Sequence, residues 1–287
     1  MPAARSSSPA VSNAPTAARS DSKDNRRRPI AAIDAPRVQR RTALLNAAVL
    51  ATRASPSKPA SAALIDAAAA QRVFASVSPS IVAIGEVREN GEVVSRGSGV
   101  CWATTTDACY VVTNAHCLSS SNVTTKSAPS LCLLFKNISG SDQENVQVVL
   151  SSKSLLYSDA ARDVGFVRVD VNDFPKGFDL PRAAAFGSSA NLLTGQGVFA
   201  LACAPDGART LHGGVISGLR RKAPMARGGV LSDLIQTDAS VSESSSGGAL
   251  CDSNGRVIGM LTSIGGVNGV NFAIPIDVAR LVAEGTA

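Results

Sequence analysis

The sequence predicts an all-β protein whose antiparallel sheets are closed into barrels or stacked as a sandwich. Short β-branched runs recur between Gly, Asp and Asn turn signals, and helical periodicity is confined to the two ends of this region. The runs are GSGVCW, CYVVTNA, SLCLLFK, VQVVLSS, VGFVRVD, GVFALACA, GGVISGL, LSDLIQT, RVIGMLTS and VNFAIP. Many short strands joined by such turns are typical of closed or sandwiched antiparallel sheets. The 287 residues, 45% of them apolar, can bury a sizeable core in one large or two small domains.

The helical segments flank this β-rich region. Residues 64–74 have an Ala-rich helical spacing that ends at Ser78-Pro79, and residues 81–87 then alternate like a strand. The last thirteen residues, PIDVARLVAEGTA, predict a short closing helix. No run of about 18 apolar residues occurs, so we expect no membrane-spanning helix.

The basic charge of the chain belongs to its first 63 residues. They carry 11 Lys and Arg against 3 Asp and Glu, a net of +8, whereas residues 64–287 carry 17 against 19, a net of −2. The globular part therefore lacks the basic surface that nucleic-acid binding requires, and no nucleic-acid partner is expected.

These first 63 residues have the composition of a two-part targeting leader. Residues 1–39 are rich in Ala, Ser, Pro and Arg, like an organelle transit peptide. Arg40-Arg41 then precede a short apolar run, and Ala60-Ser61-Ala62 offers a cleavage site, as in a twin-arginine export signal. The combination resembles leaders of thylakoid-lumen proteins, with a mature chain from about Ala63; a mitochondrial or other exported location, or a plain basic tail, is the alternative.

A serine nucleophile is the chemistry that the stretch SVSESSSGGAL indicates. Of three consecutive serines only Ser246 is followed by Gly-Gly, which allows the tight turn that brings backbone N–H groups toward a developing oxyanion. A serine hydroxyl needs a base within hydrogen-bond reach, most easily a histidine. The chain has two histidines, and His116 ends a strand-like run, whereas His212 lies beside a Gly turn. A lone histidine is more often an ordinary surface residue.

A carboxylate that orients the base is the third requirement. Asp163 directly precedes the run VGFVRV, and Asp159 lies four residues earlier in the loop. Most aspartates in such positions cap turns. The order His116, Asp163, Ser246 nevertheless gives a complete set of base, orienting acid and nucleophile.

Five motifs, in order, resemble the protease domain of the HtrA/Deg family: GSGV…YVVTNAH, DVGFVRV, LHGGVISGL, LIQTDASV…SSSGGAL and GVNFAIPID. The resemblance covers about Phe74 to the C-terminus. It implies a chymotrypsin-like fold of two six-stranded β-barrels over residues 64–287, with no PDZ domain, as in the PDZ-less Deg protease of the thylakoid lumen. It also implies an ATP-independent endopeptidase acting on unfolded or damaged proteins.

The resemblance assigns roles to individual residues. His116 would be the general base, Asp163 its orienting acid and Ser246 the nucleophile, with the backbone amides of Ser246 and Ser244 as the oxyanion hole. The segment Thr262, Ser263 and Ile264 would pair with the substrate backbone as an added strand. Ser240 would lie at the base of the S1 pocket and, being uncharged, would not select Lys or Arg at P1.

Ser244 departs from the family pattern, which has glycine two residues before the nucleophile. A serine there would cost about 1–2 kcal/mol if φ must be positive. If the peptide turns away instead, one oxyanion donor worth about 3–4 kcal/mol in the transition state is lost. Low activity, or a catalytically inactive scaffold or chaperone subunit, is therefore an alternative. An α/β-hydrolase esterase is a third, but it requires glycine at position 244 and βα alternation.

The cysteines are unusually many: Cys101, Cys109, Cys117, Cys132, Cys203 and Cys251. None forms a C-x-x-C pair, and we expect no metal and no cofactor. Cys101 and Cys117 resemble, in their spacing, the disulfide that brackets the catalytic histidine of trypsin-like enzymes; all six could equally be reduced and packed as small apolar residues. The family resemblance further implies a homotrimer, or a hetero-oligomer with a PDZ-bearing Deg protease, in which residues 64–80 could take part.

Overall fold

The computed structural model describes residues 66–119, 130–136, 145–151, 153–225, 228–263 and 270–285. The expected leader, residues 1–63, lies outside the described residues, as does Ile264 of the expected substrate-binding strand. None of the helices in the described ranges is both long and apolar enough to cross a membrane.

The chain enters the fold through helix α2, Ala67–Val77. Asp66 caps it by accepting a hydrogen bond from the Ala68 N–H at 3.0 Å, which satisfies one of the free donors at the helix start. Ala69, Val73 and Val77 are buried, as the spacing of four residues along one helix face requires. The predicted helix is thus present and runs three residues beyond Phe74, and the 3₁₀ turn η1, Ser78–Ser80, then leads into the first strand.

The first sheet contains seven antiparallel strands in the order β5-β4-β1-β2-β3-β7-β6. Their bounds are Ile81–Val87 (β1), Val93–Thr104 (β2), Ala108–Thr113 (β3), Ser130–Lys136 (β4), Asn145–Val149 (β5), Leu155–Asp159 (β6) and Val164–Asp170 (β7). The one-turn helix α3, Ala115–Leu118, follows β3, and the 3₁₀ turn η2, Val171–Asp173, follows β7.

This sheet has seven strands where six were expected, because the segment that supplies its two edge strands, β5 and β6, is interrupted between them. Beyond β5, the Leu150 N–H still donates to Leu131 O of β4, at 2.8 Å. Just before β6, Ser154 O accepts from the Arg168 N–H of β7, at 2.7 Å. The chain thus passes from one edge of the sheet to the other, and β5 and β6 are the two halves of one interrupted strand.

The second sheet is a closed barrel of six strands in the order β10-β13-β12-β11-β8-β9. Their bounds are Gly197–Cys203 (β8), Arg209–Pro224 (β9), Val230–Thr237 (β10), Ala249–Cys251 (β11), Val257–Thr262 (β12) and Asn271–Pro275 (β13). The 3₁₀ turn η3, Glu243–Ser245, precedes β11, and helix α4, Ile276–Glu284, follows β13. A closed barrel leaves no unpaired edge strand.

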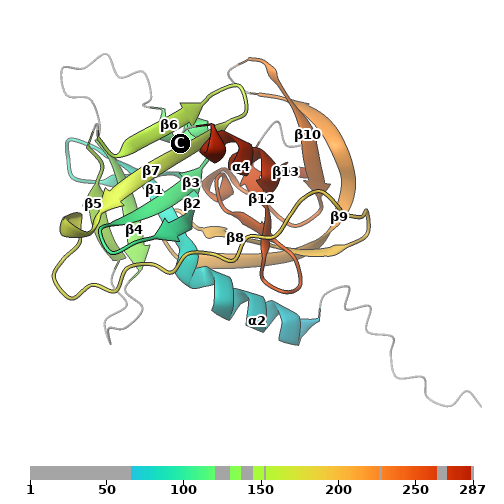
Figure 1. The fold of residues 1–287 in the computed structure, drawn as a ribbon, viewed down its shortest axis with the longest axis horizontal. Coiled ribbons are helices and arrows are strands. Elements are labelled where there is room, and N and C mark those ends of the chain that lie inside the picture. The colour runs from blue at the N-terminus through green and yellow to red at the C-terminus, as the bar shows by residue number, and fades with distance from the viewer. Residues whose placement is uncertain are drawn as a thin grey trace, which may run out of the picture. The chain divides into compact units, whose positions relative to one another are not determined.

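A shared hydrophobic core joins the two sheets and the terminal helices α2 and α4. It includes Val73 of α2, Val100 of β2, Leu201 of β8, Met260 of β12 and Val282 of α4. Figure 1 shows the strands of the first sheet, green to yellow, beside those of the second, orange to red, with α2 and α4 against them. The predicted all-β architecture of two antiparallel sheets with short end helices is therefore confirmed, and its two sheets meet where the predicted catalytic residues lie.

Candidate active site

His116 and Asp163 are joined by hydrogen bonds on the first sheet. His116 lies in α3, just after β3, and its Nδ1 is 3.0 and 2.9 Å from Asp163 Oδ1 and Oδ2. The His116 backbone N–H also donates to Asp163 Oδ1, at 3.0 Å. Because an ionised carboxylate only accepts, Nδ1 carries the proton and the other ring nitrogen, Nε2, is the acceptor in the neutral ring. That tautomer is the one a general base needs.

Asp163 is held in an unusual backbone conformation at the start of β7. It is buried, and its φ of 57° lies in the left-handed region, which costs a non-glycine residue about 1–3 kcal/mol. The Asn114 Nδ2 donates to Asp163 O at 3.1 Å, and the Thr262 hydroxyl donates to Oδ2 at 3.4 Å. Such strain is concentrated at functional sites, where the surroundings fix the conformation.

Ser246 lies in a turn that admits only glycine at the next two positions. Gly247 has φ 86°, and an ideal Cβ on it would lie 2.0 Å from Ser98 O. A Cβ on Gly248 would lie 2.6 Å from Leu201 O. Both glycines are therefore needed for the loop to approach β2 and β8, which explains the Gly-Gly that follows the serine.

The Ser246 hydroxyl accepts a hydrogen bond from the Ser263 N–H at 2.9 Å. Both Ser246 and His116 are described, and no hydrogen bond joins the hydroxyl to the imidazole. In unliganded enzymes such contacts are often long and shorten only when substrate binds. The structure thus pairs His116 with Asp163, whereas the hydrogen bond between Ser246 and His116 is not formed in this conformation.

The oxyanion side of the loop is closed. The Ser246 N–H donates to Glu243 O at 3.2 Å within η3, and Ser245 N donates to Ser242 O at 3.0 Å. Among the described non-glycine residues only Asp163, Arg220 and Asp233 have positive φ, so Ser244 carries no such strain. The Ser246 N–H, one of the two expected oxyanion donors, is therefore engaged within the loop in this conformation.

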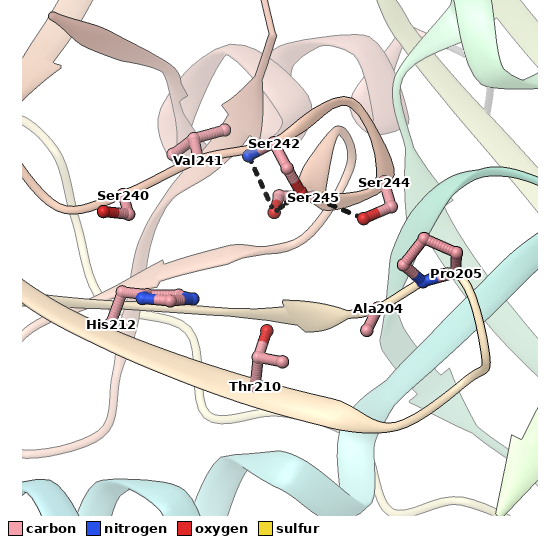
Figure 2. A pocket seen from close by; sticks show the side chains of 9 residues that line it. All are labelled: Ala204, Pro205, Thr210, His212, Ser240, Val241, Ser242, Ser244 and Ser245. Carbon is pink, nitrogen blue, oxygen red and sulfur yellow. Dashed lines mark hydrogen bonds between the residues drawn. The ribbon is translucent and has the colours of Figure 1, made fainter. Parts of the chain in front are cut away.

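Ser240, the residue expected at the S1 pocket, lies at a cavity of about 210 Å³ beside this loop. Ser240 is exposed and lines the cavity together with His212 of β9. Figure 2 shows the imidazole of His212 and the side chain of Thr210 on one side of it and the serine loop on the other. Asp159 accepts from the backbone N–H groups of Ala161 and Arg162, so it caps a turn, as most such aspartates do.

All six cysteines are free and buried, so the predicted disulfide between Cys101 and Cys117 is wrong. The β2 residue that faces Cys117 is Gly97, where an ideal Cβ would lie 2.5 Å from the Cys117 sulfur. Cys101 lies four residues further along β2, and its sulfur is 3.4 Å from that of Cys109 on β3. Elsewhere, the described part of the chain has no cluster of His, Cys, Asp and Glu that could hold a metal.

Oxidation is expected to link Cys101 to Cys109. Their hydrogen bond lowers the pKa of the Cys101 thiol and raises that of Cys109, and a lowered thiol pKa favours the reactive thiolate. Closing this short loop should stabilise the fold by about 2–3 kcal/mol on the chain-entropy model. Non-reducing peptide mapping after mild oxidation should find this pair, and Cys132→Ser should leave it intact. A linked Cys101–Cys117 peptide would contradict the assignment.

The environment of His116 predicts a reaction that is faster at alkaline pH. Burial lowers the pKa of the ring. The hydrogen bond to Asp163 and the nearby Cys117 thiol outweigh this effect and raise the pKa to about 10. Because a general base must be neutral, the rate of serine acylation should rise as pH increases from 7 toward 10. The stabilisation that protonated His116 gives the fold is complete below its unfolded pKa of about 6.5 and is lost as pH rises through about 10.

Two substitutions check this pH dependence. Asp163→Asn should move the midpoint of the acylation profile to lower pH, because it removes the charge that stabilises the imidazolium. His212→Gln removes the only other histidine and should leave the midpoint in place. A midpoint that follows His212 instead would show that His116 is not the titrating base.

Two residues of the site were not assigned from the sequence. Ser98 is fully buried, and its hydroxyl donates to Ser244 O at 2.7 Å. Asn114 is also fully buried and holds the backbone of Asp163. Both lie inside motifs of the family resemblance, Ser98 in GSGV of β2 and Asn114 in TNAH between β3 and α3, and these motifs were the signal available in the sequence.

Comparison with known proteins first defines the class of protein to which the chain belongs. Residues 97–260 match the family of trypsin-like peptidase domains. Protease Do-like 1, chloroplastic, of Arabidopsis thaliana is 33% identical over 226 residues, which cover 74% of this chain and 46% of that protein. Protease Do-like 5, chloroplastic, of the same plant is 31% identical over 239 residues, covering 75% of this chain and 70% of that protein.

The solved structures agree with this class. The crystal structure of Deg5 has a TM-score of 0.59 and 28% identity, and the match covers 75% of this chain and 91% of that one. The chain belongs to the HtrA/Deg family of trypsin-like serine peptidases, as its motifs indicated. It spans less than half the length of the first of these relatives and about two thirds of the second.

Proposed function

We propose that the chain is an ATP-independent serine endopeptidase that hydrolyses peptide bonds of unfolded or damaged proteins. The observation that carries the proposal is the pair of hydrogen bonds between His116 Nδ1 and the buried Asp163 carboxylate. It leaves Nε2 as the base toward Ser246. The reaction consumes only water, so no nucleotide is required.

In the first half of the reaction Ser246 attacks the carbonyl carbon of the scissile peptide bond. As the new C–O bond forms, the hydroxyl proton passes to His116 Nε2, and Asp163 stabilises the imidazolium that results. The proton is then given to the leaving amine as the C–N bond breaks. Water repeats the cycle on the acyl-enzyme, with His116 as its base, and restores the Ser246 hydroxyl.

The oxyanion is bound by the backbone amides of Ser246 and Ser244 in this scheme. Since the Ser246 N–H donates to Glu243 O in the present conformation, the Glu243–Ser244 peptide must turn over before the hole can form. Two aligned donors stabilise the developing charge only after that rotation. The rate is therefore proposed to depend on how often the loop opens.

Substrate would lie along the end of β12. Residues 262–264 would pair with its backbone as an added strand, while the Thr262 side chain faces Asp163. The Ser263 N–H contacts the nucleophile at 2.9 Å, so this segment and the reactive hydroxyl are adjacent. Ser240 carries no charge, which supports the proposal that Lys and Arg are not preferred at P1.

A non-catalytic scaffold or chaperone subunit is the second candidate. The closed conformation of η3 favours it, because a loop that keeps its amide occupied cannot stabilise an oxyanion. Labelling of the purified chain by a fluorophosphonate probe at near-neutral and alkaline pH separates the two. A competent serine is labelled whatever its natural substrate, whereas a scaffold is not.

The compartment proposed is the thylakoid lumen, with removal of residues 1–63. It is supported by the composition of that segment and by the chloroplastic names of two relatives. N-terminal sequencing of the native protein tests it, since a chain that retains Arg40-Arg41 would contradict it. We further propose assembly into a homotrimer, or with a PDZ-bearing Deg protease that recognises substrate.

A further inference from the structure

We propose that Ser98 is a positioning residue whose hydroxyl fixes the loop that carries the nucleophile and the oxyanion amides. The inference rests on the proposed peptidase function and adds to it a residue outside the triad. Ser98 lies in β2 of the first sheet, and it is completely buried. The residues that its hydroxyl contacts belong to the second barrel and to the loop before β11.

The hydroxyl of Ser98 has a determined orientation. It accepts a hydrogen bond from the Cys203 N–H at 2.9 Å and lies 2.7 Å from Ser244 O. A backbone N–H can only donate, and a hydroxyl has a single proton. The proton of Ser98 is therefore directed to the carbonyl of Ser244.

The Cys203 contact explains why this hydroxyl is held so firmly. Strand β11 pairs with β8 only as far as Ala249 opposite Leu201, so the end of β8 extends beyond it. Ser98 takes the N–H of Cys203 at that end. The nucleophile loop is thus connected, through one side chain, to a rigid strand of each sheet.

The backbone of Ser98 makes a second contact that a substitution would leave in place. The Ser98 N–H donates to Ser246 O at 2.7 Å, and the Thr113 hydroxyl donates to Ser98 O at 2.7 Å. Ser98 therefore contacts carbonyls on both sides of Ser245, one through its backbone and one through its side chain. Only the contact with Ser244 depends on the residue being serine.

This arrangement confines the opening of the loop to one peptide. With Ser244 O and Ser246 O both held by Ser98, the Glu243–Ser244 peptide is the part of the turn that can rotate. The amide of Ser244 then turns toward the oxyanion while Ser246 stays in place. Without the Ser98 hydroxyl, the peptide that follows Ser244 loses its hydrogen bond as well. The open loop is then less well ordered, which lowers the rate of the chemical step.

The test compares Ser98→Ala with Thr237→Val in the full chain. Thr237 is a matched control because it is equally buried, donates to Val215 O at 2.8 Å and accepts from the Ala239 N–H at 3.1 Å. Both variants lose one donated and one accepted hydrogen bond to the backbone. A comparable fall in Tm is expected for the two.

Only Ser98→Ala should lower kcat and the rate of probe labelling, by about tenfold to a hundredfold. This decrease is no larger than the one that loss of an oxyanion donor causes. KM and the pH midpoint of labelling should not change, since Thr262, Ser263 and the His116–Asp163 pair are untouched. Equal losses of activity in both variants, or full activity in Ser98→Ala, would overturn the proposal.

Hydrogen–deuterium exchange tests whether Ser98 orders the nucleophile loop, and it does so without measuring catalysis. The peptide covering residues 240–250 should exchange faster in Ser98→Ala than in Thr237→Val, relative to wild type. A wild-type chain that is never labelled would refute the peptidase function, yet faster exchange would still support the role of Ser98. Unchanged exchange in this peptide would exclude it in either case.

Discussion

Replacing Ser246 by alanine should abolish both labelling by a fluorophosphonate probe and cleavage of an unfolded protein. In the proposed mechanism this hydroxyl forms the acyl-enzyme, and loss of a nucleophilic serine from such a triad lowers kcat by roughly a millionfold. The fold should be retained, because the backbone contacts of residue 246 with Ser98 and Glu243 do not involve the side chain.

The neighbouring serine provides the matched control. Ser245→Ala removes a hydroxyl that accepts from the Ser242 N–H and caps the 3₁₀ turn, but it leaves the nucleophile and the Gly-Gly turn intact. Labelling should therefore persist. If Ser246→Ala cleaved the unfolded protein as fast as the wild type does, the peptidase function would be refuted and the scaffold function favoured.

The sequence predicted the catalytic candidates because each depends on a local pattern. Ser246 was identified from the glycines that follow it, and the structure shows that a Cβ at either position would collide with the backbone of β2 or β8. His116 and Asp163 were each placed at a strand boundary, and the structure brings them within hydrogen-bonding distance. Alternation and turn signals likewise predicted the all-β fold.

The contacts that sequence reasoning missed are those between residues far apart in the chain. Ser98 reaches Ser244 across 146 positions, and no periodicity or spacing indicates such a pairing. The disulfide failed for the same reason: β2 places Gly97, and not Cys101, against the Cys117 sulfur, and the Cys101 sulfur lies 3.4 Å from that of Cys109 instead. The sequence did not decide the conformation of η3, because it permits two backbone conformations at Ser244.

Glycine at position 244 should raise kcat, by up to about a hundredfold. In the closed loop the Ser246 N–H donates to Glu243 O, and opening requires the Glu243–Ser244 peptide to rotate into a geometry where the family pattern has glycine. If that geometry has positive φ, serine disfavours it by about 1–2 kcal/mol, whereas glycine adopts it freely. The substitution thus changes how often the oxyanion hole is formed and leaves the triad unchanged.

Ser242→Gly separates this explanation from a general loosening of the turn. Ser242 caps η3 through contacts of its hydroxyl with Ser244 and Ser245, each at 3.0 Å, so its loss weakens the closed state without easing rotation at residue 244. If backbone geometry limits the rate, Ser244→Gly should exceed Ser242→Gly in kcat, with similar KM for both. Equal gains would mean that the closed turn itself is the barrier. A fall in kcat for Ser244→Gly would mean that serine is fully accommodated in the open hole, and that the departure from the family pattern is no defect.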